Sequence, residues 1–208
     1  MKFTKKLSII VCGLTTAFVH SAVITNTYKS AAQADGQELV NNGGFEIDPL
    51  VDPSDATTSN PNITGWIKSG APIDTSVIKI SNFPKTGNQG LSLGGFTDIS
   101  YISQTISTVP GQHYQLTYYL ASTEQAPDLK NKFKVFIGGK KVDVKKDVPF
   151  QDYTQYTLDF KAKATSTEIK FGSKAKYAFF YLDDVSVKAT SKNQGENYGD
   201  PSGDDGDE

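Results

Sequence analysis

The amino-acid sequence predicts an all-β fold, a two-sheet antiparallel β-sandwich or jelly roll. Between residues 101 and 187 apolar and polar residues alternate in several short segments, which is the period-two pattern of half-buried strands. Turn residues, mainly Gly, Pro and Asn, interrupt these segments about every ten residues. No segment has the 3.6-residue period of an amphipathic helix. Many short strands without helices are typical of sandwiches and jelly rolls.

The strands expected in the first half of the domain are short and separated by long loops. One strand begins near Gln37 and runs into a turn at Gly43 and Gly44. Residues 48–63 are rich in Asp, Pro, Ser, Thr and Asn and are expected to form a surface loop. Further strands are expected at residues 65–67, 76–81 and 91–95, the last after a turn at residues 86–90.

The strands expected after residue 100 alternate more regularly, so that one apolar face can be assigned to each. These faces carry Ile102, Gln104 and Ile106; Tyr114, Leu116, Tyr118 and Leu120; Phe133, Val135 and Ile137; Tyr156, Leu158 and Phe160; and Ile169 and Phe171. Turns at residues 109–112 and 138–139 separate some of these strands. The last strand, residues 179–187, ends the predicted domain, which spans residues 35–188.

The first 34 residues are predicted to be a signal peptide. Residues 1–6 are basic, and the apolar segment at residues 7–19 is too short to span a bilayer. Residues 32–34, Ala-Gln-Ala, fit a cleavage site, and a cut near Ala22 is the alternative. The protein is therefore expected to be secreted and extracellular.

The composition of the remaining chain excludes several classes of partner and stabilising bond. Residues 1–34 hold four of the 21 lysines and no acid, so the mature chain carries 17 lysines against 23 acids. This acidic balance argues against binding to nucleic acids or to anionic membranes. The mature chain contains no cysteine and thus no disulfide, which fits a bacterial exoprotein better than a small secreted animal domain.

The C-terminal residues 189–208 are predicted to be a disordered acidic tail. Residues 193–208 contain six acids, several glycines and no lysine. Such a segment cannot bury enough apolar surface to fold. A solubilising or linker role is expected for it, since the ordered ligand spacing of a calcium loop is missing.

The last predicted strand carries an acidic residue on its apolar face. Period-two alternation places Asp183 on the same side as the apolar Val185 and Val187. A carboxylate on the core side of a strand is costly unless it is neutralised, and the chain has no arginine to pair with it. A calcium ion would resolve this conflict. The alternative is an aspartate at a strand end that faces solvent or caps a loop.

Several short motifs, in their order and spacing, resemble a known family. These are residues 39–46, the pair Gly65–Trp66, residues 90–93, residues 102–106 with 110–118, and residues 180–187. Together they resemble the galactose-binding-like jelly roll of the non-catalytic carbohydrate-binding modules attached to bacterial glycanases. The resemblance covers residues 37–188, nearly the whole expected domain.

The resemblance also implies a structural calcium ion between the two ends of the domain. In that family an early acid and a late aspartate meet at the ion. Glu46 matches the early acid and Asp183 the late one, with Asp184 as the alternate. Carbonyl groups of the turn at residues 86–90 would complete the shell by analogy. Alternatively, Glu46 only faces solvent beyond the Gly43–Gly44 turn.

The residues do not indicate an enzyme. His113 is the one histidine of the mature chain and lies beside a turn, where a surface role is expected. No cysteine nucleophile, Gly-x-Ser-x-Gly motif or zinc spacing occurs after residue 34. Asp183 and Asp184 are adjacent, so their side chains diverge and cannot form the carboxylate pair of a glycosidase.

Aromatic side chains that face outward are the candidate ligand-binding residues, because flat apolar surfaces pack against sugar rings. Tyr119 and Phe136 face away from the apolar sides of their strands. They form one floor if their strands belong to one sheet, and lie apart if the strands belong to opposed sheets. Tyr101 and Trp66 lie at strand starts, where they can line a cleft, although Trp66 is equally expected in the core.

Three functional interpretations follow. The leading one is a secreted non-catalytic carbohydrate-binding module that holds a polysaccharide or cell-wall glycan. The alternative is a secreted structural or adhesive surface protein that binds another protein through the same sandwich. A glycan-cleaving enzyme is the third and the least supported.

Overall fold

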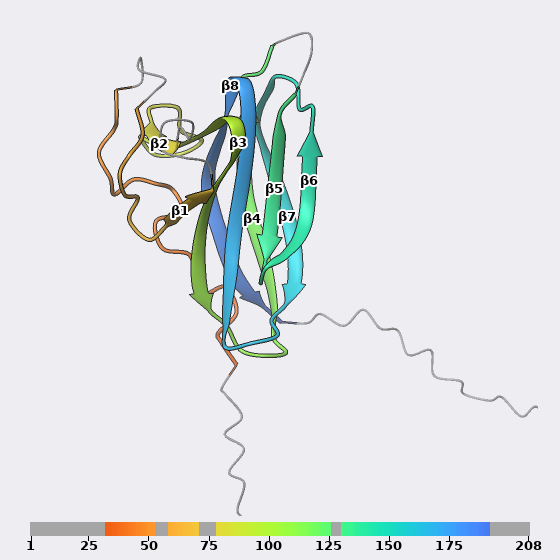
Figure 1. The fold of residues 1–208 in the computed structure, drawn as a ribbon. Helices are drawn as coiled ribbons and strands as arrows, with labels where there is room; N and C mark the ends of the chain where they lie inside the picture. Colours follow the sequence, from red (N-terminus) through yellow and green to blue (C-terminus); the bar gives the residue numbers. More distant parts are fainter. Residues whose placement is uncertain (1–31, 53–57, 71–77, 126–129, 192–208) are drawn as a thin grey trace, which may run out of the picture. The chain divides into compact units, whose positions relative to one another are not determined.

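The computed structural model describes residues 32–52, 58–70, 78–125 and 130–191. Every regular element in them is a strand (Figure 1). The strands are β1 (Ile67–Gly70), β2 (Ile78–Ser81), β3 (Gly90–Ser107), β4 (His113–Ser122), β5 (Lys132–Ile137), β6 (Lys140–Lys146), β7 (Gln151–Lys161) and β8 (Ser166–Thr190). Within this described part, no helix is long and apolar enough to cross a membrane.

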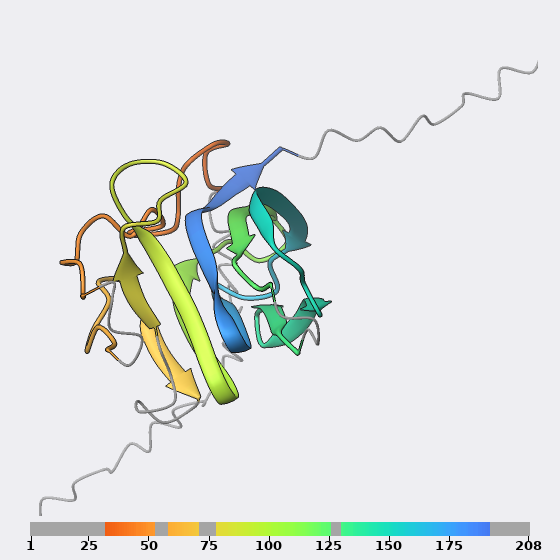
Figure 2. The same ribbon diagram turned by 90° about the horizontal axis from the view of Figure 1, so that it is seen from above.

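The strands form two antiparallel layers, and the long strands β3 and β8 belong to both. The front sheet, nearest the viewer in Figure 1, has the order β1, residues 100–107 of β3, the first part of β8, β5 and β6. The back sheet has the order β2, residues 90–95 of β3, residues 180–190 of β8, β4 and β7. Figure 2 shows β8 between β3 and the strands β4–β7. The predicted two-sheet antiparallel β-sandwich is confirmed.

The passage of β3 from one sheet to the other requires a glycine. The pairing register with β8 shifts between Gly95 and Ser100. A Cβ atom on Gly95 would lie 2.7 Å from the carbonyl oxygen of Asp98 and 2.9 Å from that of Ser173. These distances are below any real Cβ contact, so only glycine allows the two strands to approach at this bend.

The core lies between the sheets and is rich in aromatic rings. Tyr118 of the back sheet contacts Phe171 of the front sheet, with ring centroids 5.3 Å apart. Phe133 of the front sheet likewise contacts Phe180 of the back sheet at 5.5 Å. All four rings are buried, and the predicted apolar faces of β3, β4, β5 and β8 are buried with them. The apolar face of β7 is half-buried and packs against this core.

Several boundaries differ from those expected. Residues 37–46 form turns and one isolated bridge, from Glu38 to Lys188, instead of a strand. β6 was not expected, because its four lysines obscure the alternation around Val142 and Val144. β8 continues to Thr190, two residues past the predicted domain end. The expected signal peptide up to residue 31 and the tail from residue 192 lie outside the described residues.

Candidate functional site

Asp183 is fully buried, but not for the reason that alternation suggests. The register between β4 and β8 shifts by one residue between the pairs Thr117–Ser186 and Tyr119–Asp183. This bulge adds one residue to β8 and places Asp184 at a φ of 49°. Leu182 and Val185 therefore both face the core, and the prediction that Asp183 shares the face of Val185 is wrong.

Backbone N–H groups compensate the buried charge of Asp183. Its Oδ2 accepts hydrogen bonds from the amides of Lys85 (2.7 Å) and Thr86 (3.3 Å). Its Oδ1 accepts one from the amide of Asp184 (2.7 Å). Burial raises the pKa of Asp183 to about 6, although the three hydrogen bonds act in the opposite direction. The site thus holds a carboxyl group that gains a proton unusually easily.

Glu46 contacts the same loop from the other end of the domain. Its Oε1 accepts hydrogen bonds from the amides of Asn88 (2.8 Å) and Gln89 (2.9 Å). Gly87 has a φ of 69°, which favours glycine, and a Cβ atom there would lie 2.1 Å from that oxygen and displace the Glu46 carboxylate. Glu46 and Asp183 thus both accept hydrogen bonds from backbone amides of residues 85–89.

The arrangement around these acids does not fit a calcium shell as it stands. The turn directs N–H donors at Glu46 and Asp183, whereas the resemblance implies that carbonyl oxygens of this turn are calcium ligands. Asp184 accepts a hydrogen bond from the hydroxyl of Thr86 (2.7 Å). Among the described residues no three acidic, His or Cys side chains converge to hold a metal. Calcium binding by Glu46, Asp183 and Asp184 stays a prediction.

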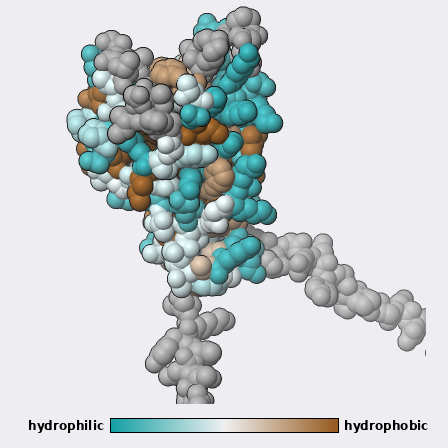
Figure 3. Space-filling model, viewed as in Figure 1, coloured by the Kyte–Doolittle hydropathy of each residue, from teal (hydrophilic) through white to brown (hydrophobic). Residues whose placement is uncertain are grey.

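Two of the predicted aromatic residues meet on the outer face of the front sheet. Tyr101 of β3 and Phe136 of β5 are half-buried, with ring centroids 6.0 Å apart at an interplanar angle of 68°. The Tyr101 ring lies over Gly172 of β8, whose Cβ would be 2.5 Å from a ring carbon. We call this pair of rings the aromatic platform. Figure 3 views the same side as Figure 1 and shows apolar patches among hydrophilic residues there.

Tyr119 does not belong to this platform. Its strand β4 lies in the back sheet, while β5 lies in the front sheet, so the single floor considered for Tyr119 and Phe136 is excluded. Tyr119 does face outward, as predicted. Its hydroxyl donates a hydrogen bond to Gln155 (3.0 Å), and the ammonium group of Lys85 lies 5.2 Å from its ring centroid.

Trp66 lies in the core and not in a cleft. Its side chain is 6% exposed and packs against Phe45 (5.6 Å between ring centroids) and Phe171 (6.2 Å). Its indole N–H donates a hydrogen bond to the carbonyl oxygen of Asn42 (3.1 Å). Of the two positions considered for Trp66, the structure selects the core.

The back sheet carries an aromatic cluster that the sequence analysis missed. Phe83, which is 44% exposed, stacks on Tyr153 (5.7 Å) and contacts Tyr181 (4.7 Å). A hollow of about 140 Å³ beside it includes Ser92, whose buried hydroxyl has no hydrogen-bond partner among the residues that the structure describes. Alternation against Phe180 and Leu182 was the signal for Tyr181, whereas Phe83 lies in a loop without any pattern.

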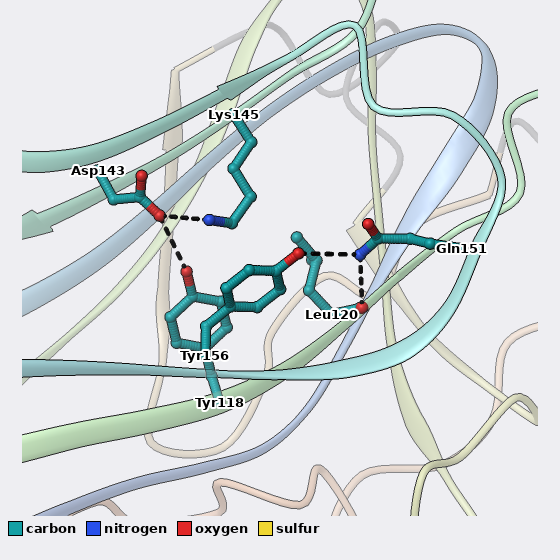
Figure 4. A network of polar contacts seen from close by, with 6 residues as sticks. All are labelled: Tyr118, Leu120, Asp143, Lys145, Gln151 and Tyr156. Carbon is teal, nitrogen blue, oxygen red and sulfur yellow. Dashed lines mark hydrogen bonds and ion pairs between the residues drawn. The ribbon is translucent and has the colours of Figure 1, made fainter.

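A polar network closes the open side of the sandwich between β6 and the back sheet (Figure 4). Asp143 Oδ2 accepts a hydrogen bond from the Tyr118 hydroxyl (3.4 Å) and forms an ion pair with Lys145 (2.6 Å). The Lys145 ammonium group lies 3.8 Å from the ring centroid of Tyr156. Burial, together with the negative charge of Asp143, raises the pKa of Tyr118 far above its ordinary value. This network links β6 to β4 and β7.

Comparison with solved structures identifies the fold. The module TmCBM61, solved in complex with β-1,4-galactotriose, superimposes with a TM-score of 0.53 at 12% identity over 74% of this chain and 99% of that one. This likeness confirms the predicted jelly roll of the carbohydrate-binding modules. The structure titled "CBM4 structure and function" (TM-score 0.45, 18% identity, 73% and 99% covered) is also similar. The CBM22-1 xylan-binding domain from Paenibacillus barcinonensis Xyn10C is similar too, with a TM-score of 0.44 at 13% identity over 64% of this chain and 89% of that one.

Comparison with sequences gives one match. Among curated proteins no relative matches this chain. Residues 38–188 match one family, which is described as a protein of unknown function. This range nearly coincides with the domain expected from the sequence.

Proposed function

The chain belongs to the family DUF642, whose description assigns no activity, so we propose its function from the geometry of the structure. We propose that it is a secreted, non-catalytic carbohydrate-binding module. We further propose that its ligand is a polysaccharide or cell-wall glycan and that binding involves no chemical step. A module of the same fold was solved with β-1,4-galactotriose, which makes glycans the first ligand class to test.

The observation that supports this proposal is the aromatic platform of Tyr101 and Phe136. The two rings are half-buried, so each is fixed by its neighbours and still presents apolar surface to solvent. Gly172 lets Tyr101 lie close to the sheet. The C–H face of a pyranose packs on such rings, and burying an aromatic side chain in this way contributes roughly 1–3 kcal/mol.

The polar neighbours of the platform suit binding better than hydrolysis. Lys134 and Lys170 lie on the same face and can donate hydrogen bonds to sugar oxygens. The acid beside them, Glu168, forms an ion pair with Lys170 (3.0 Å). Glycoside hydrolysis requires two carboxyl groups that flank the bond, and the lysine-rich surroundings of the platform do not supply such a pair.

The test is glycan binding by matched single variants. We expect the purified domain to bind at least one polysaccharide in affinity electrophoresis, with its affinity measured by calorimetry. Tyr101→Ala and Phe136→Ala should each weaken binding about tenfold, which corresponds to about 1.4 kcal/mol. Tyr119→Ala is the control, since it removes an equally half-buried ring from the back sheet.

The possible outcomes separate the interpretations. Full affinity in folded Tyr101→Ala and Phe136→Ala variants would contradict the platform. Weaker binding by Tyr119→Ala alone would move the site to the back sheet. Failure of the intact domain to bind any glycan would favour the alternative function, a structural or adhesive protein that binds another protein.

A further inference from the structure

We propose that the glycan held on the platform is anionic and carries carboxylate or phosphate groups. This inference rests on the proposed function and adds the chemical class of its ligand. It comes from the outer face of the front sheet, where six lysines surround Phe136 and the Tyr101 ring. They are Lys132, Lys134, Lys141, Lys146, Lys170 and Lys174.

The strand registers place these lysines in a regular grid on three adjacent strands. Lys132 of β5 pairs with Lys174 of β8 on one side and with Lys146 of β6 on the other. Two residues along β5, Lys134 pairs with Gly172 and Val144, and paired residues point to the same face.

The next position along β5 is Phe136 itself, which pairs with Lys170 and Lys141. Adjacent strands lie about 4.8 Å apart, and residues two apart along a strand about 7 Å. Every lysine of the grid is therefore within reach of a chain molecule that stacks on the platform.

The grid has few acids to balance it: Glu168 lies beside Lys170, and Asp147 lines a hollow together with Lys132 and Lys174. Like charges directly opposite each other on neighbouring strands destabilise a sheet. Among the described residues, Lys170 is the only lysine of the six with an ion pair, at 3.0 Å to Glu168. Asp147 alone cannot balance the three charges of the row Lys174–Lys132–Lys146, so an external anion bound there would reduce the remaining repulsion.

The positive charge is local and does not follow from a basic protein. Residues 130–174 contain eleven lysines and five acids, whereas residues 35–129 contain three lysines and ten acids. The whole chain has a net charge of −2. A basic face on an otherwise acidic domain attracts an anionic polymer to that face and repels it elsewhere.

Protection of a sheet edge explains only part of this pattern. Lysines on an edge strand discourage pairing with other molecules, which accounts for Lys141 and Lys146 on β6. It does not account for Lys132 and Lys134, because their strand β5 lies between β6 and β8.

The experiment compares polymers that differ in charge. The probes are polygalacturonate, which carries carboxylates, poly(glycerol phosphate), which carries phosphates, and a neutral β-1,4-galactan. We expect one or both anionic polymers to bind at least tenfold more tightly than the galactan. Their affinity should fall steeply between about 50 and 200 mM salt, because surface charges are screened. The anionic polymer that binds identifies the group recognised.

Two triple variants with the same change in net charge test the location. Lys132→Gln, Lys134→Gln and Lys174→Gln together should weaken binding to the anionic polymer tenfold or more. The control triple, Lys161→Gln, Lys163→Gln and Lys188→Gln, alters exposed lysines outside the grid and should change affinity less than twofold. The grid triple should also melt at the same or a higher temperature, since it removes like-charge pairs.

Failure of this inference is distinguishable from failure of the proposed function. Equal, salt-independent binding of the neutral galactan would overturn the inference and leave the glycan-binding function intact. Equal weakening by both triples would also overturn it, because unspecific charge attraction would then explain the binding. If no polymer, neutral or charged, binds, the proposed function fails as well.

Discussion

The buried carboxyl group of Asp183 should make the stability of the domain depend on pH in an uncommon direction. Burial raises the pKa of Asp183 from its ordinary 3.8 to about 6 in the folded protein. The folded state therefore binds this proton more tightly than the unfolded chain does. The free energy of unfolding should increase as the pH falls from about 7 to about 4, and this gain is lost again as the pH rises through about 6.

The size of the effect follows from the two pKa values. The difference between 3.8 and about 6 corresponds to about 3 kcal/mol. This is a large part of the stability of a typical domain, which is about 5–15 kcal/mol. Asp183 is fully buried, so solvent does not screen the effect away.

The assay is urea unfolding at several pH values between 4 and 7.5, in EDTA so that no metal competes with the proton. Asp183→Asn removes the titrating group and keeps its size and one acceptor oxygen. We expect the difference in unfolding free energy between the wild type and this variant to change by about 2.4 kcal/mol between pH 7.5 and pH 4, because the full effect is reached only below the unfolded pKa of 3.8. Other carboxyl groups titrate equally in both proteins and cancel.

Asp184→Asn is the matched control. Asp184 is the neighbouring residue, and asparagine tolerates its positive φ of 49° well. Its free energy of unfolding should keep most of the pH dependence of the wild type, because Asp183 is still present to bind the proton. The reasoning would be refuted if the difference for Asp183→Asn varied by less than about 0.5 kcal/mol.

Three further predictions concern the calcium ion, the closing network and the tail. If a calcium ion joins Glu46 and Asp183, millimolar calcium should raise the melting temperature relative to EDTA, and Asp183→Ala should abolish this increase. Identical melting temperatures with calcium and with EDTA would exclude the ion. A double-mutant cycle on Asp143→Ala and Lys145→Ala should give a coupling of about 1 kcal/mol, because their side chains are only 25% and 18% exposed; a coupling near zero would contradict the network. Removing residues 193–208 should leave the melting temperature unchanged, and a clear decrease would show that the tail packs on the domain.

The fold could be predicted because the physical signals for it are local. Alternation assigns Tyr118 and Phe133 to the core and leaves Tyr119 and Phe136 outside, and the structure confirms all four positions. The sequence analysis did not predict β6, because polar residues occupy both faces of this edge strand and its Val142 is exposed. Period-two reasoning works only where one face of a strand is buried.

The candidate site was predictable only in part, because it depends on pairings between distant residues. The one-residue bulge in β8 changes which residues on either side of Asp183 face the core. The sequence around Asp183 contains no pattern that predicts a bulge. The sequence also did not determine whether β4 and β5 share a sheet, which decided that Phe136 meets Tyr101 and not Tyr119. The lysine grid likewise becomes visible only when the registers of β5, β6 and β8 are known.

The position of β8 has a consequence for how the chain becomes a folded domain. β8 is the last strand in the sequence, yet it lies inside both sheets, between β3 and β5 in one and between β3 and β4 in the other. Neither layer can close until residues 166–190 are present, so a growing chain cannot complete either sheet before this segment has been made. Pairings this distant in sequence also make folding slow. If the protein is secreted as we propose, this topology keeps the chain from completing its sheets while it crosses the membrane.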